Sequence, residues 1–185
     1  MRTFIAIDLP DEIKNRITVL LEDLASRSKG VKWIKRQGMH ITLKFLGEIS
    51  FRQSEEVILS LQRIAEKRSR FFIKIKGTGA FPEDRRLPRI LWTGIEENKD
   101  LDLLQKDVEK ELDLIGFPKE KRQFHPHLTL GRVKSAEEID KALSFLKREE
   151  KTVFGEWETD RITFYRSLLK PNGAEYQIIK EVRLK

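Results

Sequence analysis

The strongest constraint on the fold of this chain is an order of predicted elements that occurs twice. Each half contains a strand, an amphipathic helix, a second strand, a second amphipathic helix and a third strand, and each middle strand begins with His-x-Thr-Leu, at His40 and at His127. Apolar residues at three- and four-residue spacing predict the helices, and short runs of β-branched and aromatic residues predict the strands. At 185 residues, the chain has room for one domain or two small lobes in close contact.

The predicted elements can be placed along the chain as follows. Helices are predicted over 11–30, 54–69, 98–116 and 135–149, the last with Ser135 as its cap, and strands over 4–7, 40–46, 71–76, 90–93, 127–133, 153–157, 161–165 and 176–184. Since the two motifs lie 87 positions apart at matching places, the simplest architecture is an α+β fold of two similar lobes related by a pseudo-twofold axis. The lobes, roughly 1–88 and 89–185, would form a single bilobal domain over 1–185, with the two His-x-Thr strands side by side or facing across a cleft.

Composition limits the chemistry that the chain can perform. Cysteine is absent, so disulfides and thiolate chemistry are excluded, and a structural zinc site would depend on three histidines and carboxylates. The amino-terminal apolar run is too short for a signal peptide and no later segment could span a membrane, so a cytoplasmic protein without membrane contact is expected. The net charge of +7 fits either a solvated charged surface or attraction to a polyanion such as RNA.

The histidine and the threonine of each motif project from the same face of a strand, because successive side chains alternate between faces. His40 therefore points with Thr42, and His127 with Thr129, while the residues between them point into a core. Imidazole titrates near pH 6.5, so one ring can accept a proton from an attacking hydroxyl while the other donates one to a leaving oxygen. The threonine hydroxyls can donate to an oxyanion between them. A phosphodiester fits such a site.

Neighbouring residues admit other interpretations. His125 and His127 resemble a metal pair on one strand, but no Asp or Glu lies nearby in the sequence, and metal binding is the minor alternative. His125 precedes a proline, which favours extended backbone, and we interpret it as structural or as a binding residue at the rim. Strict alternation turns both Phe45 and Arg132 away from the histidines, which predicts Phe45 in the core. Arg132 returns to the histidine side only if Gly131 forms a β-bulge.

The two motifs in their contexts, His40–Gly47 and His127–Arg132, resemble those of the RNA 2′,3′-cyclic phosphodiesterases, also called 2′-5′ RNA ligases, of the two-histidine phosphoesterase superfamily. Arg2–Ile7, Phe81–Pro82 and Pro88–Trp92 are similar too, so the resemblance covers nearly the whole chain. It implies antiparallel sheets that line a central cleft with helices outside. It also implies hydrolysis of an RNA 2′,3′-cyclic phosphate end to a 2′-phosphate, with no metal and no nucleotide cofactor. The reverse reaction would join RNA halves, tRNA halves among them, through a 2′-5′ linkage, and a monomer is expected.

The resemblance also implies roles for individual residues. His40 would be the proton donor and His127 the proton acceptor in hydrolysis, with the roles exchanged in ligation. Thr42, Thr129 and Arg132 would hold the phosphate oxygens. Candidate RNA contacts are the basic and aromatic residues outside this set: Lys35, Arg36, Phe81, Arg85, Arg86, Arg89 and His125. Two rival functions stay open, a phosphodiesterase for a small cyclic nucleotide and an RNA-binding module without catalysis.

Overall fold

The computed structural model describes residues 1–82, 87–170 and 173–185. Within these ranges the helices are α1 (Asp11–Arg27), α2 (Phe51–Ala65), α3 (Lys99–Asp113) and α4 (Ile139–Arg148), with a 3-10 turn η1 (Arg36–Gly38). The strands are β1 (Arg2–Asp8), β2 (Val31–Trp33), β3 (His40–Glu48), β4 (Phe71–Phe81), β5 (Ile90–Ile95), β6 (His127–Val133), β7 (Val153–Thr159), β8 (Arg161–Lys170) and β9 (Gly173–Arg183). Among the described residues, none of the helices has the length and apolar character needed to span a lipid bilayer.

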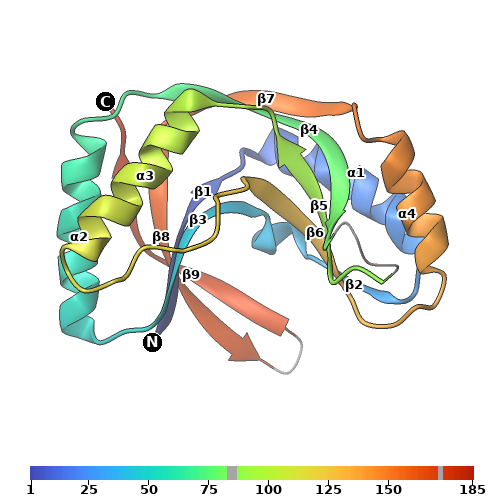
Figure 1. Cartoon of the computed structure of the whole chain (residues 1–185), viewed down its shortest axis with the longest axis horizontal. Helices are drawn as coiled ribbons and strands as arrows, with labels where there is room; N and C mark the ends of the chain where they lie inside the picture. Colours follow the sequence, from blue (N-terminus) through green and yellow to red (C-terminus); the bar gives the residue numbers. More distant parts are fainter. Residues whose placement is uncertain (83–86, 171–172) are drawn as a thin grey trace.

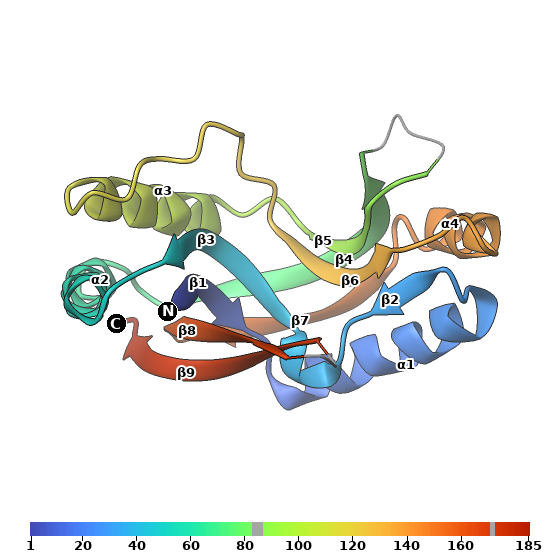
Figure 2. The same ribbon diagram turned by 90° about the horizontal axis from the view of Figure 1, so that it is seen from below.

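The described strands form one curled antiparallel sheet (Figure 1). Its order is β7-β4-β5-β6-β3-β1-β8-β9, with β2 paired to β6 outside this path. The two strands that begin with the motifs, β3 and β6, are therefore neighbours at the middle of the sheet, where Ile41 faces Leu128. Of the two arrangements expected for the His-x-Thr strands, side by side or facing across a cleft, the structure shows the first. The half-sheets on either side of this junction can be followed in Figure 2.

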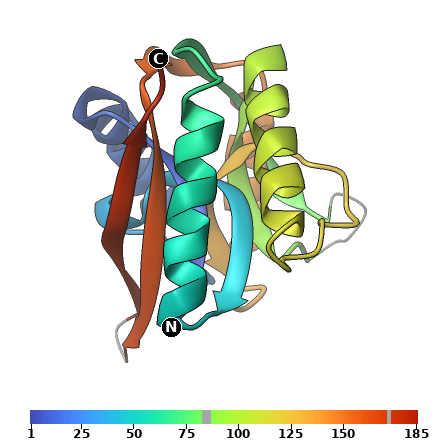
Figure 3. The same ribbon diagram turned by 90° about the vertical axis from the view of Figure 1, so that its left-hand side faces the viewer.

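Along this order, four strands lie on each side of the β3–β6 junction, and each of these half-sheets contains strands from both halves of the sequence. β4, from the first half, pairs with β5 and β7, whereas β8 and β9, from the second half, extend the half-sheet of β1 and β3. The helices are exchanged in the same way, because α1 packs near α4 and α2 packs beside α3 (Figures 1 and 3). We propose that 1–88 and 89–185 fold together as one domain, since neither stretch completes a half-sheet alone.

The helices and one face of the sheet enclose the main apolar core. β3 and β6 contribute to it the residues next to the motif side chains, and the neighbouring β1 adds two isoleucines; the set is Ile5, Ile7, Ile41, Leu43, Leu128 and Leu130. We call the opposite face, which carries His40, Thr42, His127 and Thr129, the histidine face. A second, smaller apolar cluster lies on it and consists of Phe4, Ala6 and Tyr165, with Tyr176 packed against them. Aromatic rings thus cover part of the histidine face.

Two helices begin three or more residues away from their predicted starts. α2 begins at Phe51 because Ser50 and Gln53 form a capping box, in which each side chain accepts a hydrogen bond from the other residue's backbone N–H. α4 begins at Ile139, so the prediction of Ser135 as its cap is wrong. Glu138, which precedes α4, has a left-handed backbone, and the Ser135 hydroxyl instead accepts the backbone N–H of Glu137.

Candidate active site

The four motif residues lie together at the centre of the histidine face. The antiparallel β3–β6 pair is joined at Ile41 and Leu128. The positions that flank this pair bring His40 to the side of Thr129 and Thr42 to the side of His127. All four residues are half-buried. The structure therefore brings two imidazoles and two hydroxyls around one small area of the sheet.

His40 is surrounded by aromatic rings and faces one carboxylate. Its ring centroid lies 4.7 Å from that of Phe4 and 5.1 Å from that of Tyr176. Asp8 is its direct partner in the β1–β3 register. Burial lowers the pKa of His40 to about 4, the Asp8 carboxylate opposes this shift, and the positive charge of Lys14 adds to it. In the protein alone, His40 is therefore neutral at pH 7.

Two hydroxyl groups of β8 hold the Asp8 carboxylate in place. Thr163 Oγ1 donates to one carboxylate oxygen at 2.8 Å, and the Tyr165 hydroxyl donates to the other. Burial, together with the hydrogen bond to Asp8, raises the pKa of Tyr165, so its hydroxyl keeps the proton that it donates. The negative charge of Asp8 thus has a fixed position beside His40.

His127 lies in a different environment from His40. Its Nδ1 is 2.7 Å from the carbonyl oxygen of His125. A carbonyl oxygen only accepts hydrogen bonds, so Nδ1 carries the proton and the neutral ring presents an unprotonated Nε2. Burial lowers the pKa of His127, the bond to the carbonyl opposes this, and the charge of Arg132 adds to it. These contacts suit a neutral proton acceptor.

Both motif strands contain a β-bulge directly after the threonine. In the β5–β6 pair, Trp92 faces Thr129 and Leu91 faces Gly131, so one strand has an extra residue. The bulge breaks the alternation, and exposed Arg132 returns to the histidine face. The condition under which Arg132 would share the face of the histidines, a β-bulge at this point of β6, is therefore met.

A matching bulge in β3 shows that the prediction of Phe45 as a core residue is wrong. Ile5 faces Lys44 and Ala6 faces Thr42, so Leu43 is the extra residue. Leu43 and Lys44 are both buried, while Phe45 is 68% exposed and its ring lies 5.9 Å from that of Phe4 on the histidine face. The prediction failed because it assumed unbroken alternation.

Lys44 occupies the buried position that alternation had assigned to Phe45. Its Nζ donates to Glu109 Oε2 at 2.6 Å and to the carbonyl oxygen of Pro118 at 2.8 Å. Glu109 also accepts hydrogen bonds from the Gln105 side chain and from the backbone N–H of Glu120. This network connects β3 to α3 and to the segment that leads into β6 and His127.

Gly131→Ala is expected to destabilise the protein by about 1–3 kcal/mol, the usual cost of overpacking a filled site. A Cβ at position 131 would lie 2.6 Å from Val31 Cγ1 and 2.9 Å from Trp33 Cε3. Urea unfolding measures the effect, and Gly38→Ala is the matched control, because among the described residues a Cβ there would meet only Tyr176, at 3.6 Å. Equal losses of stability in the two variants would argue against close packing of the bulge.

The predicted basic contacts have different surroundings. Lys35 and Arg89 are exposed. The Arg36 guanidinium forms an ion pair with Asp11 at 2.8 Å, so RNA would have to compete for it. Arg85 and Arg86 lie outside the described residues.

Phe81 and His125 lie on the His127 side of the site. The Phe81 ring is 5.0 Å from Trp92 and meets His127 edge-on at 5.4 Å. The His125 side chain is exposed, and it is the His125 carbonyl that contacts His127. Phe81 therefore packs against a proposed catalytic ring, as His125 does through its backbone.

The geometry adds residues that the sequence did not single out. Asp8, Phe4, Tyr165 and Tyr176 surround His40, and Lys32 faces Arg132 in the β2–β6 pair. Asp8 carried one signal, because it is a carboxylate at the end of a buried apolar strand. The contacts with β8 and β9 span most of the chain and have no local signature.

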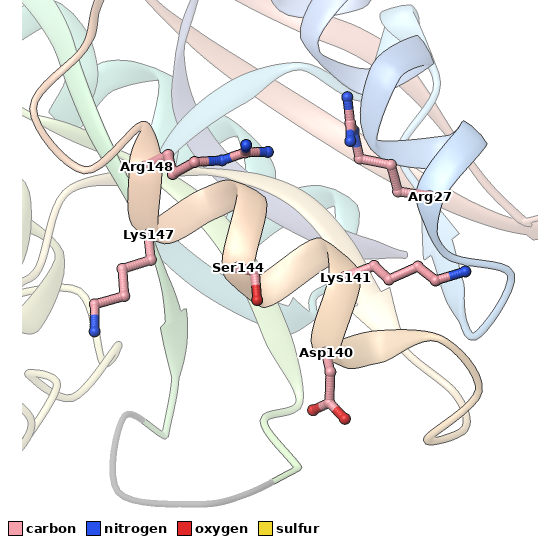
Figure 4. Close-up of a pocket in the computed structure, with 6 residues that line it drawn as sticks. All are labelled: Arg27, Asp140, Lys141, Ser144, Lys147 and Arg148. Carbon is pink, nitrogen blue, oxygen red and sulfur yellow. The ribbon is translucent and has the colours of Figure 1, made fainter.

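A depression of about 760 Å³ lies away from the motif residues, between α1 and α4 (Figure 4). It is lined by Arg27, Asp140, Lys141, Ser144, Lys147 and Arg148. Arg27 is already paired with Asp23, and its guanidinium packs over the Phe145 ring. The depression has no part in the motif site.

Comparison with known proteins identifies the family. The family model described as "LigT like Phosphoesterase" matches residues 7–92 and 94–176. The chain is 37% identical over 184 residues to the RNA 2′,3′-cyclic phosphodiesterase of Methanocaldococcus jannaschii, covering 98% of this chain and 99% of that protein. It is 41% identical over 156 residues to the protein of the same name from Aquifex aeolicus, covering 83% and 81%.

Solved structures share the whole fold. A protein of Thermus thermophilus superposes with a TM-score of 0.84 at 27% identity, covering 100% of this chain and 98% of that one. E. coli LigT, in a complex with 3′-AMP, superposes with a TM-score of 0.80 at 24% identity, covering 99% and 97%. The α+β fold expected from the sequence is confirmed. With the family model matching both motif-bearing halves and relatives matching nearly end to end, the chain belongs to the LigT-like phosphoesterase family.

Proposed function

We propose that this protein hydrolyses the 2′,3′-cyclic phosphate at an RNA 3′ end to a 2′-phosphomonoester. The observation that carries the proposal is the placement of His40, Thr42, His127 and Thr129 on adjacent strands of one face. Relatives that match nearly the whole chain are named for RNA 2′,3′-cyclic phosphodiesterase activity, which supports the same substrate class. RNA ends such as those of tRNA halves are candidate substrates, and we expect the protein to act as a monomer.

The reaction needs one proton removed and one proton supplied. The water oxygen attacks phosphorus in line with the 3′ oxygen, and His127 Nε2 accepts a proton from this water as it does so. The bond from phosphorus to the 3′ oxygen breaks, and His40 donates a proton to that oxygen, leaving a 3′ hydroxyl and a 2′-phosphate. Thr42 and Thr129 donate hydrogen bonds to the non-bridging oxygens, and Arg132 adds a charged contact. In 2′-5′ ligation, the 5′ hydroxyl of a second RNA would replace water as the nucleophile. His127 would accept its proton, the bond from phosphorus to the 3′ oxygen would break, and His40 would protonate that oxygen, so the two histidines would keep their roles rather than exchange them.

His40 must be protonated in the complex to act as the donor. In the protein alone, burial holds its pKa at about 4. A phosphate anion beside the ring favours imidazolium, so substrate binding raises this pKa. We therefore infer that the substrate and a proton bind together at His40.

Activity is expected to persist in EDTA, because the proposed steps use only side chains of the chain. The measurement is turnover of an RNA that ends in a 2′,3′-cyclic phosphate, with and without the chelator. Loss of all turnover in EDTA, restored by added metal, would favour the alternative in which His125 and His127 bind a metal.

A longer anion is favoured over a small cyclic nucleotide by the basic residues near the motifs. Lys32 and Arg132 face each other on β2 and β6, and Lys35 and Arg89 are exposed. Comparing kcat/KM for a cyclic mononucleotide and for an RNA end tests this preference. Faster hydrolysis of the mononucleotide would favour the small-nucleotide alternative, and tight RNA binding without any turnover would favour a binding module.

A further inference from the structure

The two halves of the site match in strand order and motif but differ in the residue opposite each histidine. Asp8 faces His40 in the β1–β3 pair, whereas Gly94 faces His127 in the β5–β6 pair. A Cβ at Gly94 would lie 2.9 Å from the carbonyl oxygen of Lys76 and 3.2 Å from the Trp92 ring, so that position has little room for a side chain. One histidine therefore has a carboxylate beside it and the other does not.

The charged and titratable groups around His40 come from several elements. Those that act on its charge or lie against its ring are Asp8 on β1, Lys14 on α1, Tyr165 on β8 and Tyr176 on β9. Arg36, on the neighbouring turn, is paired with Asp11, and Lys44 lies on the other face of β3 with Glu109. Among the described residues, Asp8 is the carboxylate that favours a positive charge on His40.

We propose that Asp8 is a positioning residue that makes His40, rather than His127, the proton donor, an inference that rests on the proposed function. The Asp8 carboxylate, fixed by Thr163 and Tyr165, stabilises imidazolium at His40 once a phosphate anion is bound. The carbonyl of His125 fixes the neutral tautomer of His127 that accepts a proton. Two symmetry-related motifs thereby acquire opposite roles.

Asp8→Asn tests this assignment through the pH dependence of kcat. A proton donor loses activity as pH rises through its pKa, so the alkaline limb of the profile reports on the donor. We expect Asp8→Asn to move that limb to lower pH by about one unit, the lower range for loss of a close opposite charge. This shift lowers kcat about tenfold on the alkaline side. The midpoint of the acid limb should stay within a few tenths of a pH unit of the parent value. Asp102→Asn, an exposed aspartate on α3, is the matched control and should leave both limbs in place.

Tyr165→Phe provides a second variant if Asp8→Asn does not fold. It removes one hydroxyl donor but keeps the carboxylate, so its alkaline limb should stay in place or move to higher pH. An Asp8→Asn profile that superposes on that of the parent, or a shift confined to the acid limb, would overturn the proposal. A shift of the Tyr165→Phe alkaline limb to lower pH would overturn it as well.

NMR titration of the imidazole signals separates this inference from the proposed function. With saturating inorganic phosphate, His40 should titrate at higher pH in the parent protein than in Asp8→Asn, with a smaller change at His127. Equal His40 midpoints would overturn the role of Asp8 even if the parent protein hydrolyses cyclic phosphate ends. Absence of turnover by the parent protein would instead contradict the proposed function, and the His40 midpoints would still decide whether Asp8 favours the charged ring.

Discussion

Alanine at His40 or at His127 is expected to lower kcat on an RNA 2′,3′-cyclic phosphate end by about 10²–10⁴-fold, the usual contribution of one general acid or base. Each substitution removes one of the two proton transfers, and both transfers belong to the same chemical step. Because residues that act as a unit are strongly non-additive, the double variant should lose little more than the worse single variant.

The control is Lys106→Ala, which changes an exposed residue of α3 and should keep the parent rate. Circular dichroism and thermal unfolding establish that each variant is folded. His40→Gln is a useful addition, because it keeps more of the volume packed against Phe4 and Tyr176 than alanine does. Full activity in either folded histidine variant would exclude the two-histidine mechanism.

Lys44→Met is expected to reduce the free energy of unfolding by about 3–5 kcal/mol, the range for breaking a buried ion pair from one side. The side chains of Lys44 and Glu109 are 5% and 11% exposed, and their ion pair spans 2.6 Å. Without the ammonium group, the Glu109 carboxylate stays buried, and within the described part of the chain the Gln105 amide and the Glu120 N–H are left to stabilise its charge. Urea unfolding at pH 7 measures the loss.

Lys67→Met is the matched control for this prediction. Lys67 pairs with Glu111 at 3.8 Å, but its side chain is 67% exposed, and such pairs contribute about 0–1 kcal/mol. The double variant Lys44→Met with Glu109→Leu should recover much of the stability, since it removes both charges. A Lys44→Met variant as stable as Lys67→Met would show that the buried pair does not hold β3 against α3.

The sequence predicted most reliably the elements that have a long, regular apolar period. The helices α1 and α3 and the strand β6 follow from such periods, and the doubled motif predicted that β3 and β6 would meet. β2 was not predicted, because three residues are too few to show a pattern. The exchange of β4 and β8 between half-sheets also has no local signal, since it depends on pairings between distant parts of the chain.

The two bulges show where prediction of the site succeeded and where it failed. Gly131 marked the bulge in β6, because a glycine in a strand often accompanies one. The matching place in β3 is occupied by Lys44, which carries no such signal, so Phe45 was assigned to the wrong face. Asp8 and Tyr165 lie 157 positions apart, so their contact beside His40 was not visible from the sequence.

The position of the phosphate in the product distinguishes the proposed hydrolysis from its alternatives. An RNA ending in a 2′,3′-cyclic phosphate is incubated with the protein in the presence of EDTA, and the terminal phosphate is assigned by ³¹P NMR. Since His40 is proposed to protonate the departing 3′ oxygen, the predicted product carries only a 2′-phosphate and a free 3′ hydroxyl. A product with a 3′-phosphate, or an unchanged cyclic end, would exclude the proposed hydrolysis to a 2′-phosphate.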